Sequence, residues 1–408
     1  MLHCMHFSFR YRDFKVQPRF HYIDNLRSLA LLLGIVFHAA LAYGPYFSNI
    51  WFVADPNSHV GFNYFALWSH LFRMPLFFLI AGFCAALLIE KRGSKAFISN
   101  RLKRVLLPFM VFLPITFALI FHVITWGEKI AHPLPPLFNV FKVVQDPPIS
   151  TMHLWFLWNL TQLCLLVWLL SLYKQAYRKV LSIVVRPLFL GIVLPVIIFV
   201  AMFNLMVPFP AADKLYPELW SYGLYGSMFL VGAGFYHHHE LLAGYLKRIN
   251  ILFLLAVAST IAYFAVLPAA LTIEQVIEAA NAGGVVKLEH TNIVALASQT
   301  IAIVTWTAVA LLAGFKWLNQ RNEFSVYMSN ASYWLYLIHV PLLMYIQLPM
   351  INVSLPASIK LIISVSAMVI VGVASYHLLV RNTLIGVFLN GKRQKPKQVL
   401  AQASQNNT

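Results

Sequence analysis

Long apolar runs, each bounded by polar and charged residues, recur along the whole chain of 408 residues. Most are roughly twenty residues long, the length an α-helix needs to cross the hydrocarbon core of a membrane. The pattern predicts membrane-spanning helices over residues 26–47, 62–90, 104–126, 151–173, 187–207, 219–239, 249–268, 292–314, 324–348 and 357–380. The sequence has no evident internal repeat or soluble domain. The predicted fold class is therefore all-α, a polytopic membrane protein with a bundle of about ten transmembrane helices.

The composition supports a membrane protein. The chain is 60% hydrophobic and 11% charged, with a mean hydropathy of +0.73, whereas about a quarter of the residues in a soluble domain are charged. The first 25 residues carry several charges and no apolar segment, so they do not read as a signal peptide. The three cysteines, Cys4, Cys84 and Cys164, do not suggest a disulfide framework.

The distribution of positive charge predicts the topology. With the N-terminus in the cytoplasm, 24 of the 30 Lys and Arg residues fall on the cytoplasmic side of the ten predicted spans. The other side holds only Lys129, Lys142, Lys214, Lys287 and Lys360. By the positive-inside rule, both termini are expected in the cytoplasm. The net charge of +17 is spread over helix ends rather than along one stripe, so it does not indicate a nucleic-acid partner.

These patterns divide the chain into three parts. Residues 1–25 are expected to form a basic cytoplasmic segment, and residues 26–385 a ten-span membrane domain. Residues 386–408, which are rich in Lys, Gln and Asn, are predicted to be a disordered cytoplasmic tail. Any chemistry is then expected inside the bundle or at its two ends.

The first predicted helix carries polar residues on one face. Asp24, Arg27, Gly34 and His38 lie on one stripe, because residues eleven apart return to nearly the same face at about 100° per residue. Arg27 and His38 are then separated by roughly 16 Å along the helix. An imidazole this deep in a membrane suggests a general base, although a packing role through a hydrogen bond to a neighbouring helix is the alternative.

Three further deep residues suggest one polar cavity. His70 and Arg73 share a face of the second predicted span, and His339 lies at a similar depth in the ninth. A buried guanidinium needs an anion or several carbonyls. Arg73 is therefore expected either to contact a reacting oxyanion or to form a structural pair with Asp24. A metal site is a weaker interpretation, because no carboxylate lies at that depth.

Residues near the ends of the spans suggest where substrates arrive. Arg101 and Arg104 open the third predicted span on the cytoplasmic side. They are either ordinary anchors facing anionic lipid or a phosphate clamp for a nucleotide-like acyl donor. His153 and Trp155 begin the fourth predicted span at the outer surface, where a sugar acceptor would arrive.

Five segments in order resemble motifs of the acyltransferase-3 family of integral membrane acyltransferases. The resemblance rests on Arg27 with His38, Arg73 to Phe83, Arg101 to Pro108, His153 to Leu157, and Asn330 to Pro341. It spans about residues 20–390, and the ending Val380 to Thr383 is similar to the glucan-biosynthesis subgroup. The middle spans and the loop at 269–291 match no motif.

The resemblance implies acyl transfer from cytoplasmic acyl-CoA to a hydroxyl on the far side of a bacterial inner membrane. For the glucan subgroup it implies succinylation of periplasmic glucans. Acyl-CoA is then a co-substrate rather than a bound cofactor, and the partners are a periplasmic or surface glycan and membrane lipids. The sequence does not separate succinyl from acetyl transfer and does not indicate an oligomeric state.

Resemblance and geometry together give each candidate residue a role. His38 is the expected general base, although an acyl-His38 intermediate stays open. The other expected catalytic residues are Arg73, His339 and Tyr336. The expected substrate-binding residues are Asp24, Arg27, His70, Arg101, Arg104, His153, Trp155 and Ser332. The alternative function is a secondary transporter or flippase that holds a small acid or lipid-linked sugar with the same residues.

Overall fold

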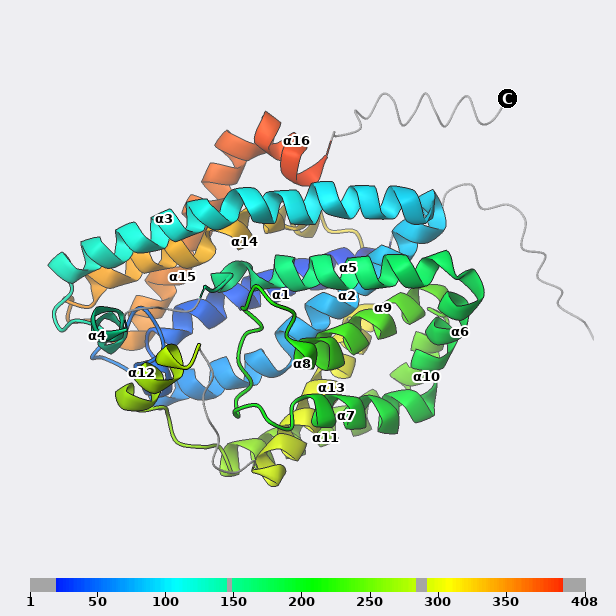
Figure 1. Cartoon of the computed structure of the whole chain (residues 1–408), viewed down its shortest axis with the longest axis horizontal. Helices are drawn as coiled ribbons and strands as arrows, with labels where there is room; N and C mark the ends of the chain where they lie inside the picture. The colour runs from blue at the N-terminus through cyan, green and yellow to red at the C-terminus, as the bar shows by residue number, and fades with distance from the viewer. Residues whose placement is uncertain (1–19, 145–148, 284–291, 392–408) are drawn as a thin grey trace, which may run out of the picture.

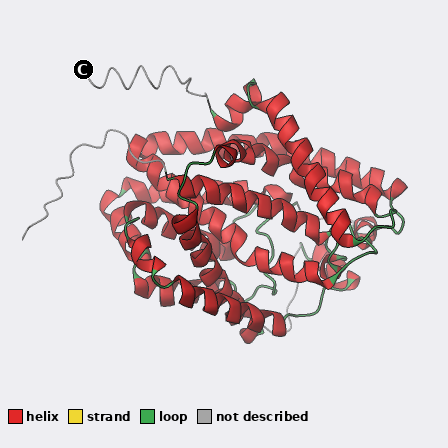
Figure 2. Ribbon diagram, turned by 180° about the vertical axis from the view of Figure 1, so that it is seen from behind, coloured by secondary structure: helices red, strands yellow, loops and turns green. Residues whose placement is uncertain are grey.

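The computed structural model describes residues 20–144, 149–283 and 292–391. The predictions for residues 1–19, including Cys4, and for residues 392–408 fall outside these ranges. The described chain forms a bundle of helices (Figures 1 and 2). The longer helices are α1 (His21–Leu41), α2 (Val60–Arg101), α3 (Leu107–Ile130), α5 (Trp155–Leu172), α11 (Ile249–Ala265), α13 (Ile293–Trp317), α14 (Glu323–Met350) and α15 (Ala357–Ser375).

Shorter helices and π-helical segments complete the bundle. The helices are α4 (Pro136–Val143), α6 (Lys174–Val184), α7 (Leu194–Ala201), α8 (Leu219–Ser221), α9 (Ser227–His237), α10 (Leu241–Leu246), α12 (Ile273–Asn281) and α16 (Leu384–Asn390). The π-helical segments are η2 (Leu102–Leu106), η4 (Phe189–Val193), η5 (Tyr222–Gly226) and η6 (Tyr376–Val380), and short 3₁₀ turns are η1 (Pro45–Phe47) and η3 (Met152–Leu154).

Each predicted span contains helix, and the described residues support a polytopic membrane protein. Six helical stretches are long and apolar enough to cross a membrane, or seven if α6 and the following helix 189–201, bent by 73°, form one broken span. One of the six stretches, Val60–Ile130, includes both α2 and α3, between which the chain reverses direction (Figure 1). The count of ten spans stays a prediction, as does the cytoplasmic side of the termini.

Several helix boundaries differ from the sequence prediction, including those of α1, which covers His21–Leu41 rather than residues 26–47. Helix α2 continues past residue 90 to Arg101, across a break at Gly93, whose φ of 80° suits glycine. The predicted disordered tail from residue 386 begins instead with helix α16, which packs on α14 and η2. Arg27 donates to the carbonyl of Ser329 and Asn390 to that of the adjacent Asn330, so the described chain begins and ends at the same end of the bundle.

Helices α2 and α9 cross in direct backbone contact. A Cβ atom added to Gly82 would lie 1.8 Å from the carbonyl oxygen of Phe229, and one added to Gly232 would lie 1.8 Å from that of Leu79. Glycines at a crossing let two membrane helices approach closely enough for backbone contacts. The reciprocal pair, Gly82 and Gly232, therefore sets the distance between α9 and the part of α2 that carries Arg73.

Substituting either glycine should destabilise the fold. Gly232→Ala and Gly82→Ala place a methyl group against a carbonyl oxygen that cannot move away alone. We expect each to cost at least about 1–3 kcal/mol and to lower the Tm of the purified protein in detergent. Gly191→Ala is the matched control, because Gly191 has no atom within 4 Å of an added Cβ. A Tm equal to that of this control would show that the crossing tolerates side chains.

Candidate functional site

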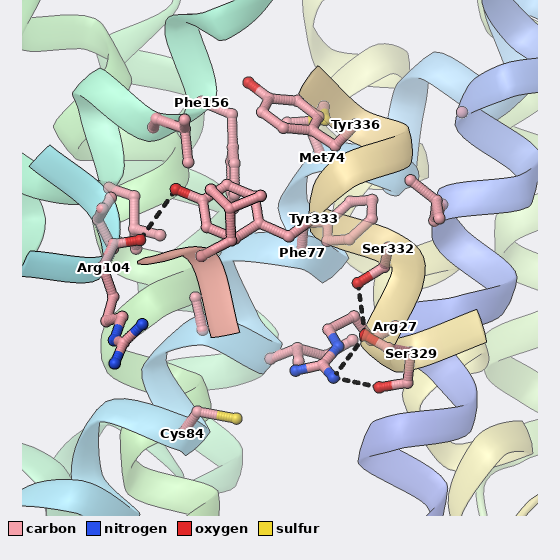
Figure 3. A pocket seen from close by; sticks show the side chains of 18 of the residues that line it. Arg27, Met74, Phe77, Cys84, Arg104, Phe156, Ser329, Ser332, Tyr333 and Tyr336 are labelled. Carbon is pink, nitrogen blue, oxygen red and sulfur yellow. Dashed lines mark hydrogen bonds between the residues drawn. The ribbon is translucent and has the colours of Figure 1, made fainter. Parts of the chain in front are cut away.

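A cavity of about 440 Å³ lies among α1, α2, α5 and α14, with η2 and α16 at one end. Most of the residues singled out from the sequence line it: Arg27, His38, Arg73, Arg101, Arg104, His153, Trp155, Ser332, Tyr336 and His339. Figure 3 shows several of these side chains pointing into the same space from different helices. The remaining two residues, Asp24 and His70, are not part of the lining.

The polar stripe on α1 faces this cavity. Arg27, Leu31, Gly34 and His38 all line it, as the helical spacing predicts. At the inner end of the stripe, the end near α16, Arg27 donates a hydrogen bond to the carbonyl of Ser329 at 3.1 Å and contacts its hydroxyl (Figure 3). Asp24 lies 3.7 Å from the Arg27 guanidinium. The carboxylate is therefore placed to orient Arg27 from outside the cavity.

Three imidazoles meet at the other end of the cavity. The ring centroids of His38 and His339 are 4.9 Å apart, and those of His153 and His339 are 5.3 Å apart. His339 uses Nδ1 to donate to the carbonyl of Tyr336 at 2.7 Å, and His153 uses Nε2 to donate to the carbonyl of Leu337 at 3.1 Å. Because a carbonyl only accepts, these bonds determine which nitrogen of each ring carries a proton.

His38 differs from its two neighbours. Its Nδ1 is buried and, like that of His153, has no hydrogen-bond partner among the described residues, but in the described chain neither nitrogen of His38 contacts a backbone carbonyl, as one nitrogen of His153 and one of His339 do. His38 is also the one ring of the three that lies on α1, the helix that carries Arg27. A ring whose nitrogen is not committed to a backbone carbonyl is the best placed of the three to exchange a proton with a substrate.

Arg73 lies beside this histidine cluster and is almost fully buried, at 4% exposure. Its guanidinium carbon is 3.8 Å from the centroid of the Phe37 ring, and its side chain crosses α1 next to Gly34. Among the described residues no carboxylate pairs with it, and its Nη1 has no hydrogen-bond partner. The predicted alternative, a structural pair with Asp24, is wrong because Asp24 pairs with Arg27 at the inner end of α1. The geometry thus leaves a buried cation that faces the cavity without an anion.

The two arginines near η2 have different surroundings. Arg101 donates to the side chain of Asn100 at 2.8 Å, and its Nε is buried without a partner. Arg104 instead donates to the carbonyl of Phe388 at 2.7 Å and to that of Val387. It therefore binds the C-terminal carbonyls of α16, the favourable place for a cation on a helix. The sequence suggests a lipid anchor or a phosphate clamp for both arginines and gives no sign of this contact.

The other predicted residues have hydrogen bonds of their own. Tyr336 donates its hydroxyl to the carbonyl of His153 at 2.7 Å, and Ser332 donates to the carbonyl of Ser329 at 2.8 Å. His70 contacts the carbonyl of Phe209 at 2.9 Å and stacks on its ring, with centroids 4.3 Å apart. His70 therefore fits the packing role that membrane histidines commonly have, and the prediction that it contacts substrate is not supported by its position.

Sequence reasoning missed several lining residues. Ser329 holds Arg27, and Tyr333 donates to the backbone carbonyl of Arg104 at 2.9 Å (Figure 3). Both lie on α14 within one turn of Ser332, so helical spacing could have included them. Leu389 and Asn390 also line the cavity, although they belong to α16, in the segment predicted to be disordered.

Comparison with known proteins finds one matching sequence family and several relatives. The sequence family described as an acyltransferase domain, acyltransferase-3, matches residues 20–377. Glucans biosynthesis protein C of Salmonella paratyphi B and that of Salmonella enteritidis are each 24% identical over 345 residues, covering 80% of this chain and 83% of the relative. The Escherichia coli protein of the same name is 31% identical over 156 residues, covering 37% of this chain and 39% of the relative. No solved structure gives a significant match.

The contrast between Arg101 and Arg104 can be tested. Arg104→Ala removes the hydrogen bonds to the carbonyls of Val387 and Phe388. Loss of about 1.5 kcal/mol from such charged bonds should speed amide exchange in residues 384–390 by roughly tenfold. Arg101→Ala is the control, because the Arg101 side chain donates to Asn100 and not to α16. Equal deuterium uptake in the two variants, measured by mass spectrometry, would contradict the assignment.

Proposed function

Since this chain belongs to the acyltransferase-3 family, we propose that it transfers an acyl group, succinyl or acetyl, from cytoplasmic acyl-CoA to a hydroxyl of a periplasmic or surface glycan. The glycan acceptor is suggested by relatives named for glucan biosynthesis. One observation carries the proposal: a single cavity joins the guanidinium of Arg27 to the imidazole of His38. It offers an anion site at one end and a base at the other.

The proposed acyl donor enters the inner part of this cavity. In the proposal, its phosphates lie near Arg27 and Arg101, whose charges suit phosphate oxygens. The guanidinium of Arg104 already donates to carbonyls of α16. It binds a phosphate only by sharing these hydrogen bonds or by giving them up. The pantetheine arm then extends along the face of α1, past Leu31 and Gly34, for roughly 16 Å. This length brings the thioester level with His38.

The acyl transfer takes place at the histidine cluster. His38 takes the proton from the acceptor hydroxyl, whose oxygen attacks the thioester carbon. Arg73 stabilises the negative oxygen of the tetrahedral intermediate, because its guanidinium is already buried and lacks an anion. The carbon–sulfur bond then breaks, and the thiolate takes the proton from His38 to give free CoA and the ester. His339, with its proton held by the Tyr336 carbonyl, supports the position of His38.

Replacing His38 tests the base assignment. His38→Ala should reduce acyl transfer by at least about a hundredfold, because a positioned general base contributes on that scale. The measurement is mass spectrometry of glycan incubated with acyl-CoA and the purified, folded protein. His122→Ala is the control, because His122 contacts the hydroxyl of Tyr345 at 2.6 Å and does not line the cavity.

Two outcomes would count against this assignment or the function. Normal acylation by folded His38→Ala would refute the role of His38 as base. Accumulation of unmodified substrate in vesicles, with no acylated product from the wild-type protein, would instead indicate the transporter alternative.

A further inference from the structure

The outer end of the cavity, which is formed by the histidine cluster, is covered by the segment between α1 and α2. The lining residues come from α1, α2, α5 and α14, from η3 in the histidine cluster, and from η2 and α16 at the inner end, and none comes from residues 42–59. This connecting segment nevertheless reaches the cluster: the indole of Trp51 stacks on the imidazole of His38, with centroids 5.4 Å apart and planes at 23°. Trp51 therefore covers one face of the His38 ring.

A buried ion pair fixes this covering segment. The Asp55 carboxylate lies 2.6 Å from the Lys360 ammonium on α15, and both side chains are fully buried. The other Asp55 oxygen accepts from the backbone N–H of Asn57 at 2.9 Å, and the Asp55 N–H donates to the carbonyl of Ala42 at 2.9 Å. A buried pair with its remaining atoms hydrogen-bonded is costly to break. The cover is thus held to the bundle four residues beyond Trp51.

Trp51 also carries an unused polar group. Its Nε1 is buried, and the described residues offer no hydrogen-bond acceptor for it. A buried donor without a partner costs about 1–3 kcal/mol, so such groups commonly mark a place where a ligand supplies the partner. The Nδ1 of His38, against which Trp51 stacks, is likewise without a partner. The two nitrogens without partners thus belong to two rings that stack on each other beside the histidine end of the cavity.

We infer that Trp51 is the positioning residue for the sugar acceptor. The apolar face of a pyranose ring replaces His38 as the stacking partner of the indole, while Nε1–H donates to a sugar oxygen. Moving the indole from imidazole to sugar uncovers His38 Nδ1 for the hydroxyl that is to be acylated. The segment 42–59 stays anchored through Asp55, so the change is confined to the residues around Trp51. This inference rests on the proposed function, because it takes the acceptor to be a glycan.

The test compares two substitutions in the full-length protein with succinyl-CoA and a gluco-oligosaccharide. Trp51→Phe keeps a ring but removes the N–H, and should raise the KM for the oligosaccharide roughly fivefold, the effect of one lost hydrogen bond. Trp51→Ala should lower kcat/KM for the oligosaccharide by more than about tenfold. It should also speed hydrolysis of succinyl-CoA without acceptor, because water then reaches His38. The KM for succinyl-CoA should not change in either variant.

Controls separate this role from a structural one. Trp317→Phe, an exposed tryptophan outside the cavity lining, should leave every parameter unchanged. An unchanged KM for the oligosaccharide in Trp51→Phe together with unchanged hydrolysis in Trp51→Ala would overturn the inference. So would parallel changes in the KM values of both substrates, which would indicate general distortion. Absence of glycan acylation by the wild-type protein would instead refute the proposed function itself.

Discussion

A buried guanidinium without an anion is the constraint around which the centre of this bundle is arranged. Arg73 is surrounded by apolar helices, and the described residues give it an aromatic face, Phe37, but no carboxylate. Burying such a cation in a membrane interior costs free energy, and a residue of this kind commonly marks a functional site. The Arg73 side chain crosses α1 next to Gly34, and the three imidazoles gather beside it. The catalytic proposal gives this charge a purpose, the transient oxyanion.

The two ends of the cavity differ in which polar groups they bring together. At the inner end, Arg27 and Arg104 donate to carbonyls of α14 and α16, while the Nε atoms of Arg27 and Arg101 are buried without a partner in the described chain. At the end formed by the histidine cluster, His38 and Arg73 each retain a buried polar atom without such a partner. A buried polar atom without a partner calls for an explanation, and a bound substrate is one. In the proposed function, phosphate oxygens meet the first group of atoms and the reacting groups meet the second.

Helical periodicity explains how much of the site could be predicted from the sequence. Arg27, His38 and Arg73 were found because spacing along a helix determines which residues share a face. His70 shares that reasoning with Arg73, yet it contacts Phe209 in a loop whose fold the spacing does not encode. For Arg104 the sequence suggests a lipid anchor or a phosphate clamp, because its partner, the end of α16, lies 284 residues away in sequence. Trp51 lies in a connecting segment without any period, so no pattern indicated that it reaches His38.

The crossing of α2 and α9 shows how residues that never meet a substrate determine the shape of the site. Helix α2 lies between α9 on one side and the cavity on the other, and its residues Ile80, Ala81 and Cys84 form part of the wall next to Gly82. With backbone against backbone, there is no flexible side chain at the contact to absorb a displacement. A larger side chain at the contact with α9 would therefore push α2 toward the cavity. The width of the cavity thus depends on residues on the opposite face of α2.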